Sequence, residues 1–192
     1  MATVNSYTVD MPTPDRTSLD AIVLAARDLL EADGLAGVTM QAVATRVGVR
    51  APSLYKRVQS REDLIRLVAE ATLRDLADRV NPAETAVDLL NGLRTFGKER
   101  PAAFQLVMTP GPGTPRVGEE VNIASSAAIL RVATDLAGEA EALEAARTLT
   151  AWATGFISME LNGSFRLGGD VDGAWEFGVA RLIAAVGMPS PG

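Results

Sequence analysis

Basic side chains are concentrated in one short part of this sequence. The window from Met40 to Arg61 contains five Lys or Arg residues and no acidic one, namely Arg46, Arg50, Lys56, Arg57 and Arg61. Outside it, 13 basic residues stand against 24 acidic ones, so the net charge of −6 combines a window of +5 with a remainder of −11. Cationic side chains at this density can bind a row of phosphates. The window is therefore a predicted nucleic-acid contact.

The rest of the composition excludes most catalytic and metal chemistry. The 192 residues include no cysteine and no histidine, which rules out a disulfide framework, a zinc finger and an imidazole general base. No glycine-rich phosphate loop followed by Lys and Ser or Thr occurs. The acidic pairs Glu119-Glu120 and Asp170/Asp172 lie at positions predicted to be exposed or to cap helices. We therefore expect no enzyme activity, no cofactor and no metal site.

The sequence also lacks a recognisable targeting or membrane segment. Its longest uncharged stretch, Pro101 to Pro115, contains four prolines and two glycines, whereas a membrane helix needs about 20 apolar residues. Residues 1–17 have neither a basic start nor an apolar core, so they do not resemble a secretory signal. We expect a cytoplasmic protein in which residues 1–16 form a disordered tail.

Two short helices joined by a tight turn must position the basic side chains. Thr39 can cap a helix over residues 40–47, and Gly48 can end it. Residues 51–58 then form a second helix, in which Pro52 occupies a first-turn position. This is the spacing of a helix-turn-helix, whose second helix offers side chains to base edges in the major groove. A solvated basic face without a partner is the alternative, but the coincidence of charge and tight turn favours DNA.

Apolar residues at helical spacing continue along the chain and predict an all-α fold. A first helix runs from Thr17 to Gly34 and a long one from Ser60 to Val80, before Pro82. Further helices are predicted over residues 83–100, 102–108, 118–136, 140–161 and 171–186. We expect an N-terminal three-helix DNA-binding domain over residues 17–62, linked by the helix 60–80 to a C-terminal helical bundle over residues 63–192.

The segment Gly34–Leu64 resembles the DNA-binding domain of the TetR family of bacterial transcriptional regulators. It reads GLAGVTMQAVATRVGVRAPSLYKRVQSREDL. The positions that match the family pattern are Thr39, Val43-Ala44, Val47-Gly48-Val49 and Tyr55. Arg57, Val58 and Arg61 stand where the family commonly has His, Phe and Lys. The substitutions keep two cationic phosphate donors and one apolar anchor.

The resemblance implies a homodimer that binds double-stranded DNA at a pseudo-palindromic operator, with half-sites about 34–36 Å apart or more. The expected phosphate contacts are Thr39, Tyr55, Lys56, Arg57, Ser60 and Arg61. The candidates for reading bases are Arg50, Ala51, Pro52 and Ser53, of which Arg50 can form a bidentate contact with guanine. Helix capping is an equally good interpretation of Thr39 and Ser60. Tyr55 could equally be a core residue.

The resemblance also implies that the last two helices form the dimer interface. Residues 140–161 are apolar on more than one face, whereas a surface helix needs only one. The interface candidates are Leu149, Ala153, Ile157, Trp175, Val179, Leu182 and Val186. The alternative is that both helices are ordinary core of a monomer. The phrase Trp152–Phe165 is similar to a C-terminal subtype of the family named for Trp-His-Gly, with Thr154 in place of the histidine.

A small, apolar effector is expected inside the C-terminal bundle. Such pockets combine hydrophobic walls with few polar groups. The lining candidates are Phe96, Phe104, Leu106, Met108, Trp152, Phe156 and Met159. The polar candidates that could orient a ligand are Gln105, Asn122, Ser126, Thr150 and Glu160. Core packing is the alternative interpretation of the apolar set.

These features together predict a ligand-responsive transcriptional regulator, namely a repressor that leaves its operator when the effector binds. The long helix over residues 60–80 would carry the change from the bundle to the DNA-binding domain. The alternatives are an activator, or a non-enzymatic helical ligand-binding or interaction protein whose helix-turn-helix does not repress.

Overall fold

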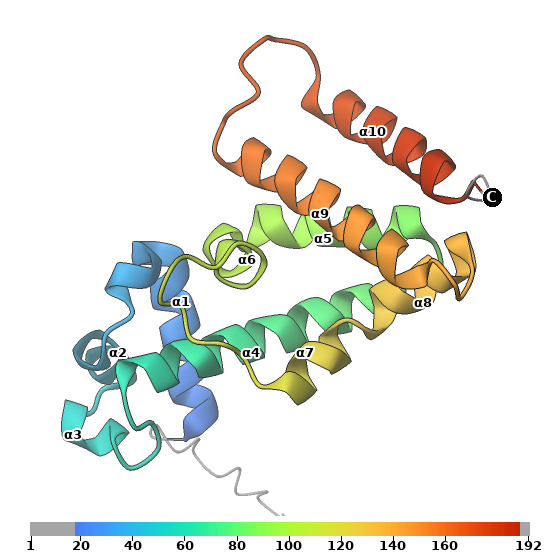
Figure 1. Ribbon diagram of the computed structural model, residues 1–192. Helices are drawn as coiled ribbons and strands as arrows, with labels where there is room; N and C mark the ends of the chain where they lie inside the picture. The colour runs from blue at the N-terminus through green and yellow to red at the C-terminus, as the bar shows by residue number, and fades with distance from the viewer. Residues whose placement is uncertain (1–17, 189–192) are drawn as a thin grey trace, which may run out of the picture.

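The computed structural model describes residues 18–188, and the regular structure in this range is entirely helical (Figure 1). The all-α prediction is confirmed, whereas the tail predicted over residues 1–16 lies outside the described residues. The helices of this range are α1 (Leu19–Gly37), α2 (Met40–Val47), α3 (Ala51–Leu54), α4 (Arg61–Val80), α5 (Ala86–Glu99), α6 (Pro101–Met108), α7 (Glu119–Ser125), α8 (Ala127–Ala137), α9 (Ala142–Leu161) and α10 (Val171–Val186). None of them is long and apolar enough to span a membrane.

The N-terminal unit is built from α1, α2, α3 and the first half of α4. Its core side chains Ile22, Val43, Leu54, Val58 and Leu64 are fully buried. Gly34 has a φ of 68°, so helical geometry within α1 is interrupted at the glycine predicted to stop it. The α2–α3 turn depends on Gly48, whose φ of 77° is in the left-handed region that glycine adopts without steric cost.

Two helices differ from the pattern that the sequence predicts. The helix predicted over 51–58 is regular only to Leu54, although a further turn follows in which the Val58 amide donates to the Leu54 carbonyl at 2.9 Å. The single helix predicted over 118–136 is two helices that meet at Ser126. There, the hydroxyls of Ser125 and Ser126 both donate to the Asn122 carbonyl. Such side-chain bonds compete with the helical backbone pattern, which accounts for the break.

Helix α4 belongs to both halves of the described chain (Figure 1). Its N-terminal half buries Leu64, Ile65 and Val68, and α4 packs against α1. Its C-terminal half buries Leu76 and Val80, and the same helix also contacts α5, α6 and α7. A displacement of α4 must therefore alter the packing of both units.

Helix α10 lies on the outside of the bundle against α5 and α9 (Figure 1). It is anchored by Trp175, which is 2% exposed and whose Nε1 donates to Asn91 Oδ1 at 2.8 Å. The guanidinium of Arg94 lies 5.1 Å from the Trp175 ring and pairs with Glu160 on α9 at 2.6 Å. One polar and aromatic cluster thus joins α5, α9 and α10.

Close packing between α5 and α9 depends on the absence of a side chain at Gly97. A Cβ atom built there would lie 2.7 Å from Ile157 Cγ2 and 3.3 Å from Phe104. Ile157 and Phe104 are fully buried, so neither has free space to retreat into. Gly92 lies in the same helix, but its Cβ atom would meet only Val80 at 3.4 Å, an ordinary contact.

We expect Gly97→Ala to destabilise the protein by about 1–2 kcal/mol, because the overpacking cost exceeds the gain in helix propensity. Gly92→Ala is the matched control and should stabilise by about 0.5–1 kcal/mol. Thermal denaturation followed by circular dichroism measures both, with a shift of about 2–4 °C per kcal/mol. Equal shifts of the same sign would contradict the packing argument.

Candidate nucleic-acid interface and helical cavity

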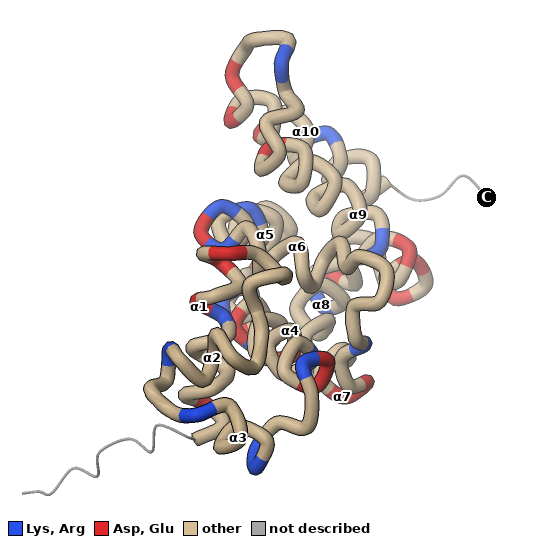
Figure 2. Tube along the Cα trace, turned by 90° about the vertical axis from the view of Figure 1, so that its left-hand side faces the viewer, with Lys and Arg blue, Asp and Glu red and all other residues tan. Residues whose placement is uncertain are grey.

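The basic window lies at one end of the molecule, around α2 and α3 (Figure 2). Arg50, Tyr55, Lys56 and Arg57 are all exposed on α3 and its flanking residues. Pro52 is exposed between them, and Ala51 and Ser53 are half-buried. The exposure of Tyr55, at 55%, argues against its being a core residue. The first turn of α3 and the turn after it therefore present cationic, hydroxyl and small side chains on one surface.

Three of the predicted phosphate contacts also hold the local fold together. Thr39 Oγ1 accepts from the Ala42 amide and Ser60 Oγ accepts from the Asp63 amide, so both residues are N-caps. Arg61 donates through Nε to the Val38 carbonyl at 2.7 Å and through a terminal nitrogen to the Leu35 carbonyl at 2.6 Å. These bonds satisfy carbonyls at the end of α1, so this guanidinium is already engaged within the protein.

Arg46 is also engaged within the protein, since it pairs with Asp28 of α1 at 3.1 Å. Exposed pairs of this kind contribute little to stability, but this one reduces the charge that α2 offers to DNA. Arg50 occupies the N-cap position of α3 and makes no capping hydrogen bond with its side chain. The cationic surface is consequently centred on α3 and its following turn rather than spread evenly over the window.

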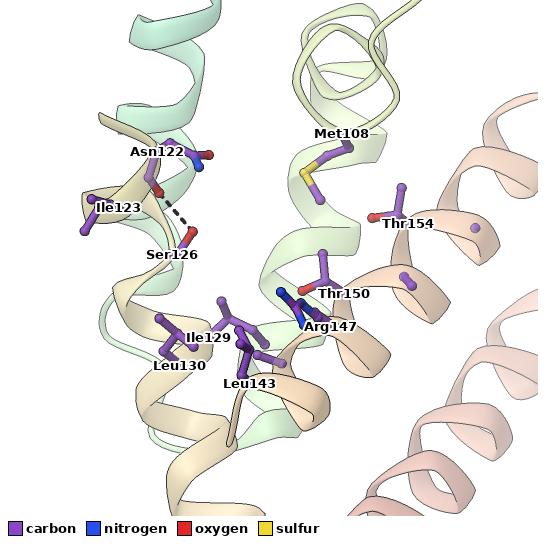
Figure 3. A pocket seen from close by; sticks show the side chains of 13 residues that line it. Met108, Asn122, Ile123, Ser126, Ile129, Leu130, Leu143, Arg147, Thr150 and Thr154 are labelled. Atoms are coloured by element: carbon purple, nitrogen blue, oxygen red, sulfur yellow. Dashed lines mark hydrogen bonds between the residues drawn. The ribbon is translucent and has the colours of Figure 1, made fainter. Parts of the chain in front are cut away.

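A cavity of about 810 Å³, widely open to solvent, lies between α6, α7, α8 and α9 (Figure 3). Its lining residues are Met108, Asn122, Ile123, Ser126, Ile129, Leu130, Leu143, Ala146, Arg147, Thr150, Ala151, Thr154 and Gly155. A smaller cavity of about 220 Å³ continues inward and shares Met108, Asn122, Ser126, Ile129 and Thr150 with it. The inner walls are chiefly leucines of α4 and α5. Together they form an apolar site with a few polar groups, as ligand sites usually are.

The structure builds this cavity from a different apolar set than the sequence indicates. Of the predicted apolar residues only Met108 lines the outer cavity. Phe96, Phe104 and Leu106 are buried core. Trp152 and Phe156 pack on Trp175 toward α10, with ring centroids 5.1 Å from it, and Met159 is exposed. These side chains are apolar enough for a pocket, but helical periodicity cannot tell a core face from a cavity face.

The predicted polar residues agree better with the cavity. Asn122, Ser126 and Thr150 line it, whereas Gln105 does not and Glu160 is paired with Arg94. Arg147 also lines the cavity, although the sequence pattern did not single it out. Its spacing to Thr150 and Thr154 is i, i+3 and i+7, which places all three on one face of α9, so this polar stripe could have been found from the sequence.

Most of the residues predicted to form the dimer interface are covered by the chain's own core. Leu149, Ala153 and Ile157 are fully buried, and Trp175 and Val179 are 2% and 4% exposed. Leu182 and Val186 are half-buried. The physical reason is that the apolar stripes of α9 pack on α5 and on α10, which leaves other faces of the two helices outward.

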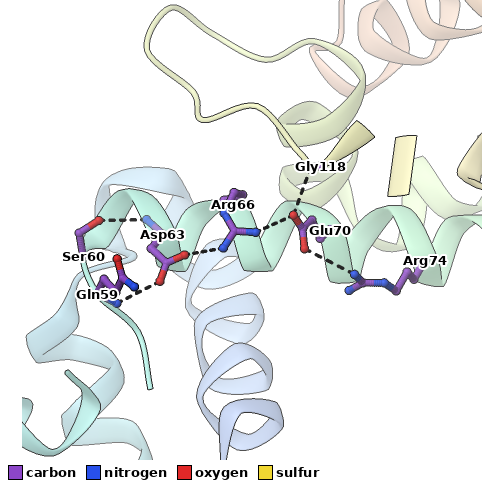
Figure 4. A network of polar contacts seen from close by, with 7 residues as sticks. All are labelled: Gln59, Ser60, Asp63, Arg66, Glu70, Arg74 and Gly118. Carbon is purple, nitrogen blue, oxygen red and sulfur yellow. Dashed lines mark hydrogen bonds and ion pairs between the residues drawn. The ribbon is translucent and has the colours of Figure 1, made fainter. Parts of the chain in front are cut away.

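A carboxylate on α4 connects the cavity to the N-terminal unit (Figure 4). The side chain of Glu70 is 8% exposed and accepts from Arg66 at 2.7 Å, from Arg74 at 3.4 Å and from the backbone amide of Gly118 at 3.2 Å. Gly118 is the N-cap of α7, which carries Asn122 and Ile123. Burial acts to raise the pKa of Glu70, but the hydrogen bonds from Arg66 and Gly118 outweigh it and hold that pKa below its ordinary value.

A second carboxylate makes an equivalent connection from α1. Glu31 accepts from the backbone amides of Ala102 and Ala103 at 3.1 and 3.0 Å. These amides belong to the first turn of α6, where backbone N–H groups lack helical partners. Helix α6 ends at Met108, which lines the cavity. The two helices that supply one side of the cavity, α6 and α7, are thus both tied to helices that position the basic surface.

Comparisons with known proteins agree with this architecture. Residues 22–68 match the model described as bacterial regulatory proteins, tetR family, and residues 86–182 match tetracyclin repressor-like, C-terminal domain. Over 68 residues the chain is 37% identical to the uncharacterized HTH-type transcriptional regulator Rv0681 of Mycobacterium tuberculosis, a match that spans 35% of this chain and 31% of that relative. The chain thus spans about a third of the length of the curated relatives that it matches.

Solved structures share the fold over most of the chain. The putative regulatory protein SCO4313 has a TM-score of 0.75 at 24% identity, covering 90% of this chain and all of that one. A substituted form of TetR from Acinetobacter baumannii AYE, crystallised in complex with minocycline, has a TM-score of 0.65 at 23% identity, covering 88% of this chain and 95% of that one. At these identities the likeness concerns the fold.

We expect Glu70→Gln to lower the stability of the protein by about 1–3 kcal/mol at neutral pH, because it removes the charge that three donors share. Since folding lowers the pKa of Glu70, its contribution is present above the unfolded value near 4.5 and is lost as pH falls through the folded pKa. The difference from wild type should therefore shrink below about pH 4.5.

Urea denaturation at a series of pH values measures this difference. Glu84→Gln is the control, because Glu84 is exposed and makes no hydrogen bond or ion pair within residues 18–188. An equal loss in both variants, or a Glu70→Gln loss that does not depend on pH, would contradict the assignment.

Proposed function

Because this chain belongs to the TetR family of bacterial regulatory proteins, we propose that it is a ligand-responsive repressor which binds a pseudo-palindromic operator as a homodimer. The family places a DNA-binding domain before a ligand-binding domain, and the two family models match in that order. The single observation that carries the proposal is the exposed cationic surface around α3, set on a helix-turn-helix whose turn is fixed by Gly48.

DNA contact is assigned to the residues around α3. Arg50, with Ala51, Pro52 and Ser53 behind it, reads base edges from the first turn of α3, because the side chains at the start of a recognition helix enter the major groove. Tyr55, Lys56 and Arg57 bind phosphates beside the groove. Thr39, Ser60 and Arg61 act mainly by holding α2, α4 and the end of α1 in place.

Dimer formation is assigned to the outward faces of α9 and α10. Phe177 on α10 is 66% exposed and Met159 on α9 is 47% exposed. Gly155 and Ala151 are exposed on the same helix as Met159 and also line the open side of the outer cavity, so a partner's helix on this face would border that cavity; nothing lies within 4 Å of a Cβ atom built at Gly155. Small residues at such positions let a partner's helix approach closely. Leu182 and Val186 are half-buried and pack against the chain's own core, so they are not part of this assignment.

Ligand release of DNA is assigned to the two carboxylate ties. A ligand between α6, α7 and α9 contacts Met108 of α6 and Asn122 of α7, and it shifts these helices where its shape differs from that of the free cavity. Glu31 and Glu70 transmit a shift of α6 or α7 to α1 and α4. Helix α1 packs on α2, which in turn packs on α3, and α4 directly follows α3 in the chain. The spacing of two reading heads in a dimer therefore changes with ligand occupancy.

We expect operator affinity to depend on Arg50 and Lys56 in different ways. An operator selected from genomic fragments serves as the probe, and fluorescence anisotropy over a salt series gives the affinity. Lys56→Ala should weaken all sequences similarly and reduce the slope of log affinity against log salt by about 1. Arg50→Ala should cost about 1–3 kcal/mol on the selected operator and relax base preference.

Arg166→Ala is the control, because Arg166 is an exposed cation in the loop before α10, outside the basic window. It should leave the affinity and the salt slope unchanged. The proposal is lost if the wild-type protein shows no sequence-selective, salt-dependent affinity for any genomic fragment, or if Arg166→Ala weakens binding as much as Lys56→Ala.

A further inference from the structure

The cavity holds one cation and no acidic residue to neutralise it. Arg147 lines the outer cavity, and no Asp or Glu lines either the outer or the inner one. Arg147 makes no hydrogen bond or ion pair with any part of the chain that the structure describes, and it lies at the exposed end of the site. An uncompensated guanidinium beside apolar walls favours an anionic group, which it can bind through two parallel hydrogen bonds.

A second observation points to a ligand at the same wall. Thr154 is only 9% exposed, yet its hydroxyl has no hydrogen-bond partner among the described residues. Buried polar groups are normally paired, because an unpaired one costs free energy. Figure 3 shows Thr150 and Thr154 on α9 with their hydroxyl oxygens turned toward Met108 and α7, in line with Arg147. The unpaired hydroxyl therefore faces the space where a ligand would lie.

The inner cavity sets the shape of the remainder of the ligand. Beyond Met108 and Ile129 its walls are formed by apolar side chains of α4, α5 and α6, among them Leu76, Leu89 and Leu93. Its volume of about 220 Å³ is small compared with the 810 Å³ of the outer cavity. A compact ring system fits the outer part alone, whereas an unbranched chain can extend from Arg147 past Met108 and fill both parts.

We propose that the effector is an elongated apolar molecule with one anionic head, such as a medium-chain carboxylate. Arg147 binds the head, the hydroxyls of Thr150 and Thr154 donate to it or to an adjacent oxygen, and the chain enters the leucine-lined inner cavity. This assignment of a ligand class rests on the proposed function, since it takes the cavity of the regulator as the effector site.

The decisive measurement is calorimetric titration of the full-length protein with decanoate and with decan-1-ol, which differ in the charged head. We expect wild type to bind decanoate about tenfold more tightly than the alcohol. Arg147→Gln should remove this preference, while Arg166→Gln, which removes an exposed cation outside the cavity, should retain it. Each methylene added from octanoate to decanoate should tighten binding by up to about fourfold.

Thr154→Val tests the unpaired hydroxyl with a side chain of nearly the same shape. It should weaken decanoate binding severalfold without lowering the melting temperature of the free protein, because no bond within the protein is lost. A melting temperature that falls together with the affinity would show that the hydroxyl serves the fold, and would overturn its assignment to the ligand.

Three results would overturn the ligand class. They are equal affinities for acid and alcohol, an Arg147→Gln variant that still prefers the acid, and a wild-type protein that binds none of the carboxylates. A fourth such result would come from analytical ultracentrifugation of Arg147→Gln. If this variant sediments as a monomer and binds decanoate with unchanged affinity, the arginine belongs to the subunit interface and not to the ligand site.

The ligand class and the proposed function fail in different measurements. Operator release by a neutral compound, with Arg147→Gln responding as wild type does, would remove the anionic class and leave the regulator intact. Decanoate binding that depends on Arg147 but leaves operator affinity unchanged would support the ligand class and count against release of DNA by the ligand.

Discussion

The arrangement of the whole molecule depends on α4 being one continuous helix with two separate buried faces. Leu64, Ile65 and Val68 belong to the core of the N-terminal unit, and Leu76 and Val80 belong to the bundle. A helix cannot kink sharply between these faces without losing backbone hydrogen bonds. A displacement of α4 would therefore change the packing of both units, which is the basis of the proposed coupling between them.

Two carboxylates connect α1 and α4 to the starts of other helices. The side chain of Glu70 accepts a hydrogen bond from the backbone amide that precedes α7, and that of Glu31 accepts from two amides in the first turn of α6. Because such amides have no helical partner, the bonds satisfy groups that would otherwise need water. Each bond also fixes the position of a helix that lines the cavity. The contacts that stabilise these helix starts are thus the same ones to which the proposed coupling is assigned.

Exposed, unengaged cations occur in both units of the described chain. Around α3 the described surface presents exposed cations such as Arg50 and Lys56, while Arg46 and Arg61 of the same window are engaged within the fold. In the bundle some arginines are engaged as well, as Arg94 is with Glu160 and Asp172 and Arg131 is with the carbonyls of Asn81 and Ala83. Among the described residues that line the cavity, Arg147 alone is cationic. Both units therefore have exposed cations at the sites for which we propose an anionic partner.

The sequence by itself determined the helical class, the helix-turn-helix, the basic window and the span of α10, because these follow from local periodicity, capping residues and a left-handed glycine. Only the tertiary structure decided which apolar face meets another helix and which borders a cavity. The hydrophobic effect is non-directional, so an apolar side chain gives no indication of which partner will cover it. Trp175, predicted at a subunit interface, and Phe96, predicted in a pocket, are both core. Polar groups require partners of defined geometry. For this reason Asn122 and Thr150 were better guides to the cavity, and the unpaired Thr154 hydroxyl became visible only once its neighbours were in place.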